Sequence, residues 1–397
     1  MRICFLFSLS LMAVRGVFAS AGKVERAFVG GLIGDALSLG GHYEYDAKKI
    51  KQNGGFKSYS PPGEANNGIG WGTANYHPGK KAGDLTDSGE VAIMLLDHLV
   101  ELKRGGALAS YSFDSYAQHW KRAIDDGYGS CNFMSVGREA KGCPPGLKPG
   151  YINGASRRTL QALTQHPTAT GQARRALAAD VNCLIAATHF LPLFLVESDQ
   201  EVLVRQAVDT VYLSHRHADP LAAAEFLARA MFLIIHRGAD LEGALTAAAA
   251  ATSNPLVAKW LADAQQKVAE ALDPSSQLYR AELVDDTAIT SMSRLWDIGK
   301  TEPIKIGKAS PTEGALPSAL YFALKYKHDF PGALIANAEC GGDSAARGIV
   351  IGMLLGATLD WVEANPQHEW LTGLNELKRV QAQMRELRSS TAGEAEL

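Results

Sequence analysis

The chain has 397 residues, of which 46% are hydrophobic and 20% are charged, and its formal net charge is -3. This composition is that of a folded globular protein, and it excludes a disordered or fibrous chain. The small net charge gives no reason to predict nucleic acid or an anionic membrane as a partner. We therefore expect the partner to be a small molecule or another protein.

The N-terminus has the pattern of a secretory signal. Met1 and Arg2 precede an apolar run over residues 3–14, and residues suited to signal-peptidase cleavage follow at 17–19. The pattern predicts a signal peptide over residues 1–19 and an exported protein. Because the apolar run is too short to cross a bilayer, we expect no membrane span in the mature chain. A buried N-terminal helix or an uncleaved anchor is the alternative.

Four cysteines remain after the predicted signal: Cys131, Cys143, Cys183 and Cys340. Four cysteines pair in three ways, and their spacing does not choose among these. Cys131 and Cys143 lie in one segment rich in Gly and Pro and are able to bridge. Unpaired thiols are the alternative, because a core of this size needs no crosslink.

Helical periodicity dominates the chain. A potential N-cap, Ser112, precedes four large residues at helical spacing, Phe113, Tyr116, Trp120 and Ile124. A second segment has Asp219 as its expected cap, Pro220 in the first turn and Gly238 just after the last turn. Alternating strand patterns are nearly absent, so we predict an all-α fold.

Two segments rich in Gly and Pro, residues 51–83 and 125–154, interrupt the helical pattern. Irregular segments of this length are usually functional, so we predict that they form walls or lids of a site. Helical patterns of similar composition lie on both sides of them, which argues against linkers. We expect one domain over residues 20–380 and a polar tail over residues 381–397.

An apolar stretch over residues 349–359 carries glycines at four-residue spacing, with Gly348, Gly352 and Gly356 on one helical face. The stretch is too short to span a membrane and is flanked by charged residues. We therefore predict a central buried helix that packs closely along its glycine face.

Three segments combine acidic residues with glycines or a helix start. They are GGLIGDALSLGGHYEYD (30–46), GDLTDSGEVA (83–92) and AECGGDSAARGIVIGMLLGA (338–357). Glycines let the backbone approach a ligand, and an adjacent apolar helix holds the carboxylate near a medium of low dielectric constant. Each segment alone is a weak signal.

Together and in this order, the three segments resemble the motifs of the ADP-ribosylglycohydrolase family. In that family a G-D-A-L-G type helix comes first, T-D-D-T at a helix start comes second, and G-G-D-T-D-T before a glycine-faced helix comes third. The resemblance covers nearly all of the chain after the predicted signal. It implies a single orthogonal bundle of many helices and two Mg²⁺ ions that hold the ribose of ADP-ribose. It also implies a carboxylate that activates water to cleave the glycosidic bond to the modified acceptor.

The second and first motifs match the family in part. Thr86 and Asp87 stand at the positions of a ligand Thr and a ligand Asp, whereas Ser88 stands where the family has a second Asp. The family's acidic residue after the first motif falls on His42, and Glu44 follows two residues later.

The third motif is also incomplete. Asp343 matches its first Asp, but Ala345 and Ala346 replace its second Asp and its Thr. With GGHYEYD and GGDSAARG, this pattern is similar to a divergent branch of the family, the jellyfish J crystallins and selenoprotein J. No selenocysteine is present, and we carry over no redox role.

The resemblance implies Mg²⁺, but the charges favour one ion over two. Two ions bring four positive charges, whereas Asp87 and Asp343 offer two negative ones. One ion would be balanced, with Thr86 and Ser88 as neutral oxygen ligands. A second ion would need another acid: Glu44, Asp35 or Asp84. A site without metal is the remaining alternative.

From the resemblance we predict Glu44 as the general base, with Asp87 as a second catalytic residue. Predicted substrate contacts are Asp35, His42, Gly341, Gly342 and Arg347. Structural interpretations stand beside these. Asp87 with Glu90 fits a capping box, Asp343 fits a helix cap, and Arg347 fits an ion pair with Asp343 that takes the place of a metal.

The function that we expect is hydrolysis of an N- or O-glycosidic bond to ADP-ribose through an oxocarbenium-like transition state. The alternative is a catalytically inactive crystallin-like scaffold, or a protein that binds a nucleotide sugar without turnover. A redox enzyme would need a reactive thiol. Cys340 is the candidate, but apolar burial and Asp343 are expected to raise its pKa.

Overall fold

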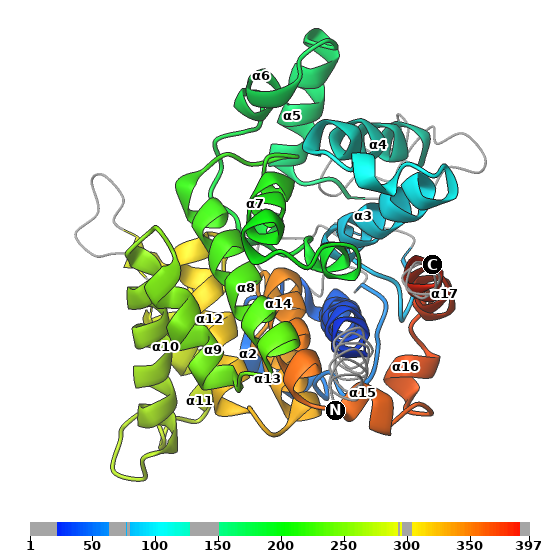
Figure 1. The fold of residues 1–397 in the computed structure, drawn as a ribbon. Helices are drawn as coiled ribbons and strands as arrows, with labels where there is room; N and C mark the ends of the chain where they lie inside the picture. Colours follow the sequence, from blue (N-terminus) through cyan, green and yellow to red (C-terminus); the bar gives the residue numbers. More distant parts are fainter. Residues whose placement is uncertain are drawn as a thin grey trace, which may run out of the picture.

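The computed structural model describes residues 22–62, 77, 80–127, 151–292, 294–295 and 304–389. Within these ranges the chain forms helices around one core, together with a two-stranded antiparallel sheet of β1 (Arg294–Leu295) and β2 (Ile304–Lys305) (Figure 1). The predicted all-α fold is confirmed. Among the described helices, none combines the length and apolar character that crossing a bilayer requires.

The helices are joined by connections of widely varied length. In order they are a first helix over residues 22–38, α2 (Ala47–Gln52), α3 (Asp87–Arg104), α4 (Phe113–Gly127), α5 (Gly154–Gln165), α6 (Gly171–Ala176), α7 (Gln200–Val211), α8 (Ala218–Arg237), α9 (Leu241–Ala251), α10 (Leu256–Leu272), α11 (Val284–Met292), α12 (Thr312–Lys325), α13 (Phe330–Cys340), α14 (Ser344–Thr358), α15 (Trp361–Ala364), α16 (Glu369–Thr372) and α17 (Leu377–Arg388). Short 3-10 helices are η1 (Leu39–Gly41), η3 (Leu108–Ser110), η5 (Leu184–Ala187) and η6 (Leu191–Leu195).

Several sequence predictions fall on other parts of the chain. The predicted signal peptide, Cys131 and Cys143 lie outside the described residues, as do residues 63–76 and 128–150 of the two segments rich in Gly and Pro. The two remaining cysteines of the mature chain, Cys183 and Cys340, are free thiols.

The helix α14 is buried at the centre of the molecule and crosses the first helix through glycines. A Cβ atom on Gly348 would lie 2.4 Å from the carbonyl oxygen of Gly34, and one on Gly34 would lie 2.1 Å from that of Gly348. The same relation holds between Gly352 and Gly30, at 2.0 Å. The predicted glycine-faced central helix is confirmed, and its partner is a second helix that carries glycines of its own.

The helix ends match the predictions only in part. The N–H of Ser115 donates to Ser112 Oγ at 3.2 Å, so Ser112 caps α4 as predicted. Gly238 ends α8 in the left-handed conformation, with φ of 68°. The predicted N-cap Asp219 is wrong, because the side chain of His217 caps α8 and the Asp219 carboxylate accepts from Asn182 instead.

The predicted polar tail begins too early. The helix α17 extends to Arg388 and packs on α3, and three side chains of α17 are buried against the core, Val380, Met384 and Leu387. Its charged face pairs with α3 through Arg379 and Asp97. Within residues 381–388 the tail prediction is therefore wrong, because an amphipathic stripe holds this segment on the domain.

Two buried histidines, His189 after η5 and His215 after α7, lie close enough to interact electrostatically. His189 is 4% exposed and His215 is 1% exposed. Burial is the main cause that lowers the pKa of His189 to about 3 and the pKa of His215 to about 4. Both imidazoles are therefore neutral in the folded protein at neutral pH.

Gly348→Ala should lower the free energy of unfolding by about 1–3 kcal/mol, because the added methyl group would overpack the contact with Gly34. Gly22→Ala is the control, since a Cβ on Gly22 in the same first helix would lie 3.9 Å from its nearest neighbour. Urea unfolding of both variants measures the difference. Equal stability of the two variants would contradict the proposed backbone contact.

His189→Gln should flatten the dependence of stability on pH. The unfolded chain takes up a proton near pH 6.5, whereas folded His189 does so only near pH 3, so stability falls as the pH falls between these values. Removing His189 should reduce this slope by up to about 1.4 kcal/mol per pH unit between pH 6 and 4. Buried carboxylates such as Asp35 contribute with the opposite sign, so the informative quantity is the difference between variant and wild type. The exposed His166, changed to Gln, should leave the slope unaltered.

Candidate active site

The first and second motifs meet at a fully buried hydrogen-bonded pair. Asp35 lies on the first helix and accepts from the Thr86 backbone N–H at 2.7 Å and from the Thr86 hydroxyl at 2.6 Å. The Thr86 oxygen in turn accepts from the N–H of Ser88 at 3.1 Å and caps α3. Burial raises the pKa of Asp35 to about 7, and the two Thr86 donors act against this rise.

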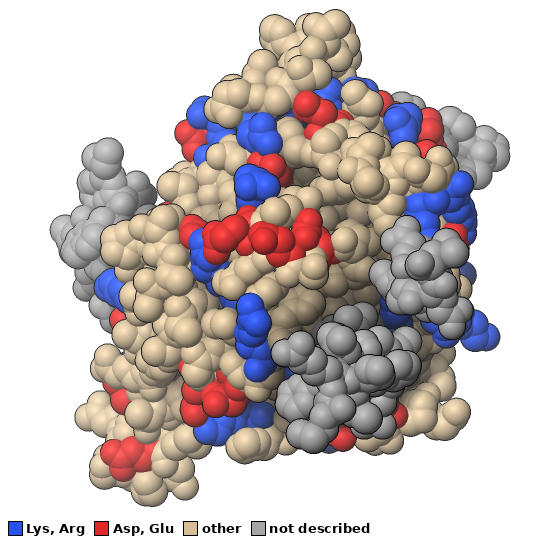
Figure 2. Space-filling model, in the orientation of Figure 1, with Lys and Arg blue, Asp and Glu red and all other residues tan. Residues whose placement is uncertain are grey.

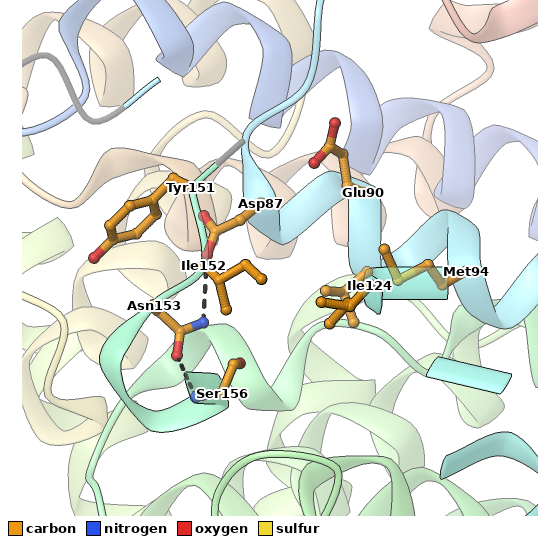
Figure 3. A pocket seen from close by; sticks show the side chains of 9 residues that line it. Asp87, Glu90, Met94, Ile124, Tyr151, Ile152, Asn153 and Ser156 are labelled. Atoms are coloured by element: carbon orange, nitrogen blue, oxygen red, sulfur yellow. Dashed lines mark hydrogen bonds between the residues drawn. The ribbon is translucent and has the colours of Figure 1, made fainter. Parts of the chain in front are cut away.

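Because Thr86 is the cap, Asp87 is free for another role. The interpretation of Asp87 and Glu90 as a capping box is wrong, since Asp87 is the first helical residue and Thr86 precedes it. The Asp87 carboxylate faces the start of α5, where Asn153 Nδ2 donates to it at 3.3 Å (Figure 3). Asn153 also caps α5 by accepting from the N–H of Ser156. Burial raises the pKa of Asp87 to about 6, and the Asn153 hydrogen bond and Lys80 oppose it.

Asp343 occupies the N-cap position of α14, but its side chain makes no cap hydrogen bond. The interpretation of this carboxylate as a helix cap is therefore wrong. Burial raises the pKa of Asp343 to about 7, the Arg347 guanidinium lowers it, and the charge of Asp87 raises it further. This coupling places the acids of the second and third motifs in one electrostatic environment.

Two imidazoles lie beside the two acids. His42 Nε2 is 3.9 Å from Asp343 Oδ1, and His77 Nε2 is 3.8 Å from Asp87 Oδ1. The two rings are 5.5 Å apart, and the Tyr151 ring lies 5.6 Å from that of His77. Burial is the first cause that lowers both imidazole pKa values, that of His77 to about 3. The predicted pocket residue His42 is thus a neutral group next to Asp343.

Gly341 and Gly342 join two loops through their backbones. Both are in the left-handed region, with φ of 67° and 73°. A Cβ on Gly341 would lie 2.0 Å from the carbonyl oxygen of Glu44, and one on Gly342 would lie 2.3 Å from that of Lys308. These glycines therefore pack the loop that carries Asp343 against its neighbours. Their contact with substrate stays a prediction.

Arg347 is 0% exposed and supports the same loop. It donates to the carbonyl oxygens of Gly341 at 2.6 Å and Asp343 at 3.1 Å, and to the side-chain oxygen of Asn337 at 2.9 Å. The hydrogen bond to Asp343 goes to its backbone rather than its carboxylate. Direct contact with a ligand would require this loop to move, because the guanidinium has no exposed surface.

Glu44 is held in the turn that precedes α2. Its carboxylate accepts from the backbone N–H of Asp46 at 2.8 Å. Burial raises its pKa, and the neighbouring charges that affect the pKa are those of Lys49, Asp46 and Lys308. The structure brings Asp87 and Asp343 into one electrostatic environment, whereas Glu44 is connected to the loop of Asp343 through its backbone. The role of Glu44 as general base therefore stays a prediction.

Sequence reasoning missed several residues of the site, namely Tyr43, His77, Tyr151, Asn153 and Cys183. The charges of Asp343 and Asp87, after burial, raise the pKa of the Cys183 thiol, which places Cys183 near the acids. For Cys340 the raising charges after burial are Asp285 and Asp286, not Asp343 as expected. Both thiols are protonated at neutral pH and unreactive as nucleophiles, which disfavours the redox interpretation.

A small pocket of about 20 Å³, partly open to solvent, lies against Asp87 (Figure 3). Its walls are mainly apolar, from Val91, Met94, Ile124 and Ile152, and its polar groups are Asp87, Glu90, Tyr151, Asn153 and Ser156. An apolar wall with a few convergent polar groups is typical of small-molecule sites. On the face seen in Figure 2, acidic side chains form a row across the middle.

These features define an all-α protein in which buried acids lie at the starts of α3 and α14. The sequence profile of the ADP-ribosylglycohydrolase family matches residues 19–396, and the chain belongs to this family. Among solved structures, an "ADP-ribosylglycohydrolase-related protein complex" superposes with a TM-score of 0.56 at 20% identity, covering 94% of this chain and 98% of that one. At this identity the likeness shows the fold alone. No curated protein sequence matches this chain.

The buried acids should differ in their effect on stability. Asp35→Asn should lower the free energy of unfolding by about 1–3 kcal/mol, because an amide cannot accept both Thr86 donors. Asp343→Asn should raise it in EDTA, on the order of 1 kcal/mol or more, because burial raises the pKa of Asp343 to about 7 and its carboxylate makes no cap hydrogen bond that the amide would lose. Urea unfolding at pH 8 tests both, and a loss of stability in Asp343→Asn would contradict this account.

Proposed function

We propose that this protein binds ADP-ribose or a related nucleotide sugar together with one Mg²⁺ ion and hydrolyses the N- or O-glycosidic bond to an acceptor. Membership of a hydrolase family supports the reaction class. The single observation that carries the proposal is the pair of buried carboxylates, Asp87 and Asp343, at the starts of two helices, where the charge of Asp87 raises the pKa of Asp343.

The donor set fits a single Mg²⁺ ion. Asp87 and Asp343 supply two negative charges, and the hydroxyls of Thr86 and Ser88 lie in the same turn of α3. Among the described residues, no group of three closely spaced His, Cys, Asp or Glu side chains includes Asp87 or Asp343. Mg²⁺ is usually held by one or two carboxylates, with water and substrate completing its shell. When bound, the ion would supply positive charge that holds the ribose hydroxyls.

The residues of the chain itself suit an anionic ligand with a ring system. The starts of α3, α5 and α14 bring backbone N–H groups and the positive ends of helix dipoles near Asp87, which favours the phosphates of a nucleotide sugar. The apolar wall of Val91, Met94 and Ile124 offers a surface for a ring. Neutral His42 and His77 are able to hydrogen-bond to a sugar without adding charge.

Glu44 is the carboxylate that we propose to take a proton from the attacking water. Its backbone oxygen accepts from the N–H of Gly342 at 2.5 Å, so its loop is tied to the motif that carries Asp343. Burial raises its pKa toward the range of a general base. The N–H of Asp46 occupies one acceptor site on Oε1, and a carboxylate has further acceptor sites for the attacking water.

The alternative is a scaffold of the crystallin type that has lost turnover. Ala345 and Ala346 favour it, because the third motif lacks two of its ligands. The similarity to J crystallins and selenoprotein J rests on the sequence stretches alone and belongs to this alternative. We also propose that the protein is exported, on the basis of the apolar run over residues 3–14.

ADP-ribose should raise the thermal midpoint of the mature protein in Mg²⁺ but not in EDTA. A ligand at a hundredfold excess over its dissociation constant stabilises the fold by about 2.7 kcal/mol. Asp343→Asn should abolish the shift, whereas Asp125→Asn, an exposed acid on α4, should keep it. A shift that survives EDTA would contradict the metal proposal, and no shift in either buffer would favour the scaffold.

Glu44→Gln should lower kcat for release of ADP-ribose from modified peptides by about 10²–10⁴-fold, because a general base contributes a factor of this size. Its binding of ADP-ribose, followed by the thermal shift, should stay close to that of the wild type. Unchanged turnover in this variant would remove Glu44 from the mechanism and direct attention to Asp87.

A further inference from the structure

A second group of potential metal ligands lies between α3 and α4, three turns along α3 from Asp87. His98 and Glu101 are one turn apart on α3, and His119 faces them from α4. Glu101 Oε2 is 2.8 Å from His119 Nδ1 and 4.0 Å from His98 Nδ1. One donor atom from each of the three side chains lies within 4.8 Å of the others, the one such group of three among the described residues.

The hydrogen bonds around His98 favour one tautomer. The hydroxyl of Ser115 lies 2.9 Å from the carbonyl oxygen of Ser112, to which it is able to donate its proton. With the proton placed there, His98 Nε2 is the donor in its contact of 3.1 Å with Ser115 Oγ. His98 Nδ1 is left with a lone pair.

That lone pair has no hydrogen-bond donor. His98 is 3% exposed, and its Nδ1 is a buried atom with no hydrogen-bond partner within the described part of the chain. The atom faces the Glu101 carboxylate, which is itself only an acceptor. Two acceptors that face each other in this way repel, and a cation between them removes the repulsion.

We propose that His98 Nδ1, Glu101 Oε2 and His119 Nδ1 bind a divalent transition-metal ion of the Zn²⁺ type, with a fourth position open to water. Two imidazoles and one carboxylate form a ligand set that Zn²⁺ accepts and that Mg²⁺, which prefers oxygen, does not. The bond from His98 Nε2 to Ser115 is the outer hydrogen bond that commonly orients a ligating histidine. On binding, His119 moves its ring hydrogen to Nε2, so no net proton need be released.

The distances are close to those of a tetrahedral site. Zn²⁺ with ligand bonds of about 2.0–2.2 Å needs donors roughly 3.3 Å apart. The observed 2.8 and 4.0 Å bracket this value. The side chain of Glu101 is 58% exposed and is able to rotate, which would make the two distances more equal.

One neighbouring charge opposes the ion. Arg122 Nη2 is 3.7 Å from Glu101 Oε2 and competes for this carboxylate, although its side chain is 57% exposed and able to swing away. The site thus joins two helices and lies apart from the pocket at Asp87. We expect a bound ion to hold α4 against α3, the helix that begins at Asp87 of the candidate active site.

The test is a Zn²⁺ titration of the mature chain, expressed without a histidine tag, by competition with a chromophoric chelator. Wild type should bind one equivalent at this site, and bound Co²⁺ should give the visible absorption of a four-coordinate ion. His119→Ala should weaken binding by about a hundredfold or more, since it removes one of three ligands. Arg122→Gln should strengthen it, because it removes the competing charge.

Two controls separate this site from other sources of metal binding. Changing the exposed His166 to Ala should leave the affinity for Zn²⁺ unaltered, and so should Asp343→Asn, which is expected to abolish only the Mg²⁺-dependent binding of ADP-ribose. Equal Zn²⁺ affinity of wild type and His119→Ala would overturn the proposal. So would the absence of a high-affinity equivalent in the wild type, or a weaker affinity in Arg122→Gln.

Discussion

The close crossing of the first helix and α14 is the constraint on which the rest of the site depends. Gly34 and Gly348 meet backbone to backbone, which leaves no room for side chains between the two helices. Ser38, one turn after Gly34, joins them further by donating to the carbonyl oxygens of Gly34 and Ser344. Asp35 follows Gly34 directly and is therefore fixed at full burial, where its carboxylate needs internal hydrogen-bond donors.

Fully buried polar residues fix the positions of the two acids, Asp87 and Asp343. Asp35 takes both donors of Thr86, this contact fixes the start of α3, and the start of α3 fixes Asp87. Arg347 holds the carbonyl oxygens of Gly341 and Asp343 and shapes the loop before α14. Asp35 and Arg347, which we predicted to contact substrate, thus act as positioning residues in this structure. They hold the segments that carry Asp87 and Asp343.

Local patterns were sufficient to predict the fold and the central helix, because helical spacing and glycine spacing are properties of one segment. Caps were less predictable. At α3 and α8 the acid looked like the cap, but an earlier residue has the extended backbone that a cap needs: Thr86, directly before Asp87, and His217, two residues before Asp219. The convergence of Asn153 and His77 on Asp87 was beyond sequence reasoning, because contacts between distant segments leave no periodic signal.

The acids of the site differ in the hydrogen bonds that their carboxylates receive. Asp35 receives two strong hydrogen bonds from Thr86, and Asp87 receives one longer bond from Asn153. The Asp343 carboxylate makes no cap hydrogen bond, and the neutral imidazole of His42 lies 3.9 Å from it. A buried carboxylate without compensation either takes up a proton or holds a cation. In the proposed function, a bound cation would therefore compensate Asp343 most, in a motif whose second Asp and Thr are replaced by alanines.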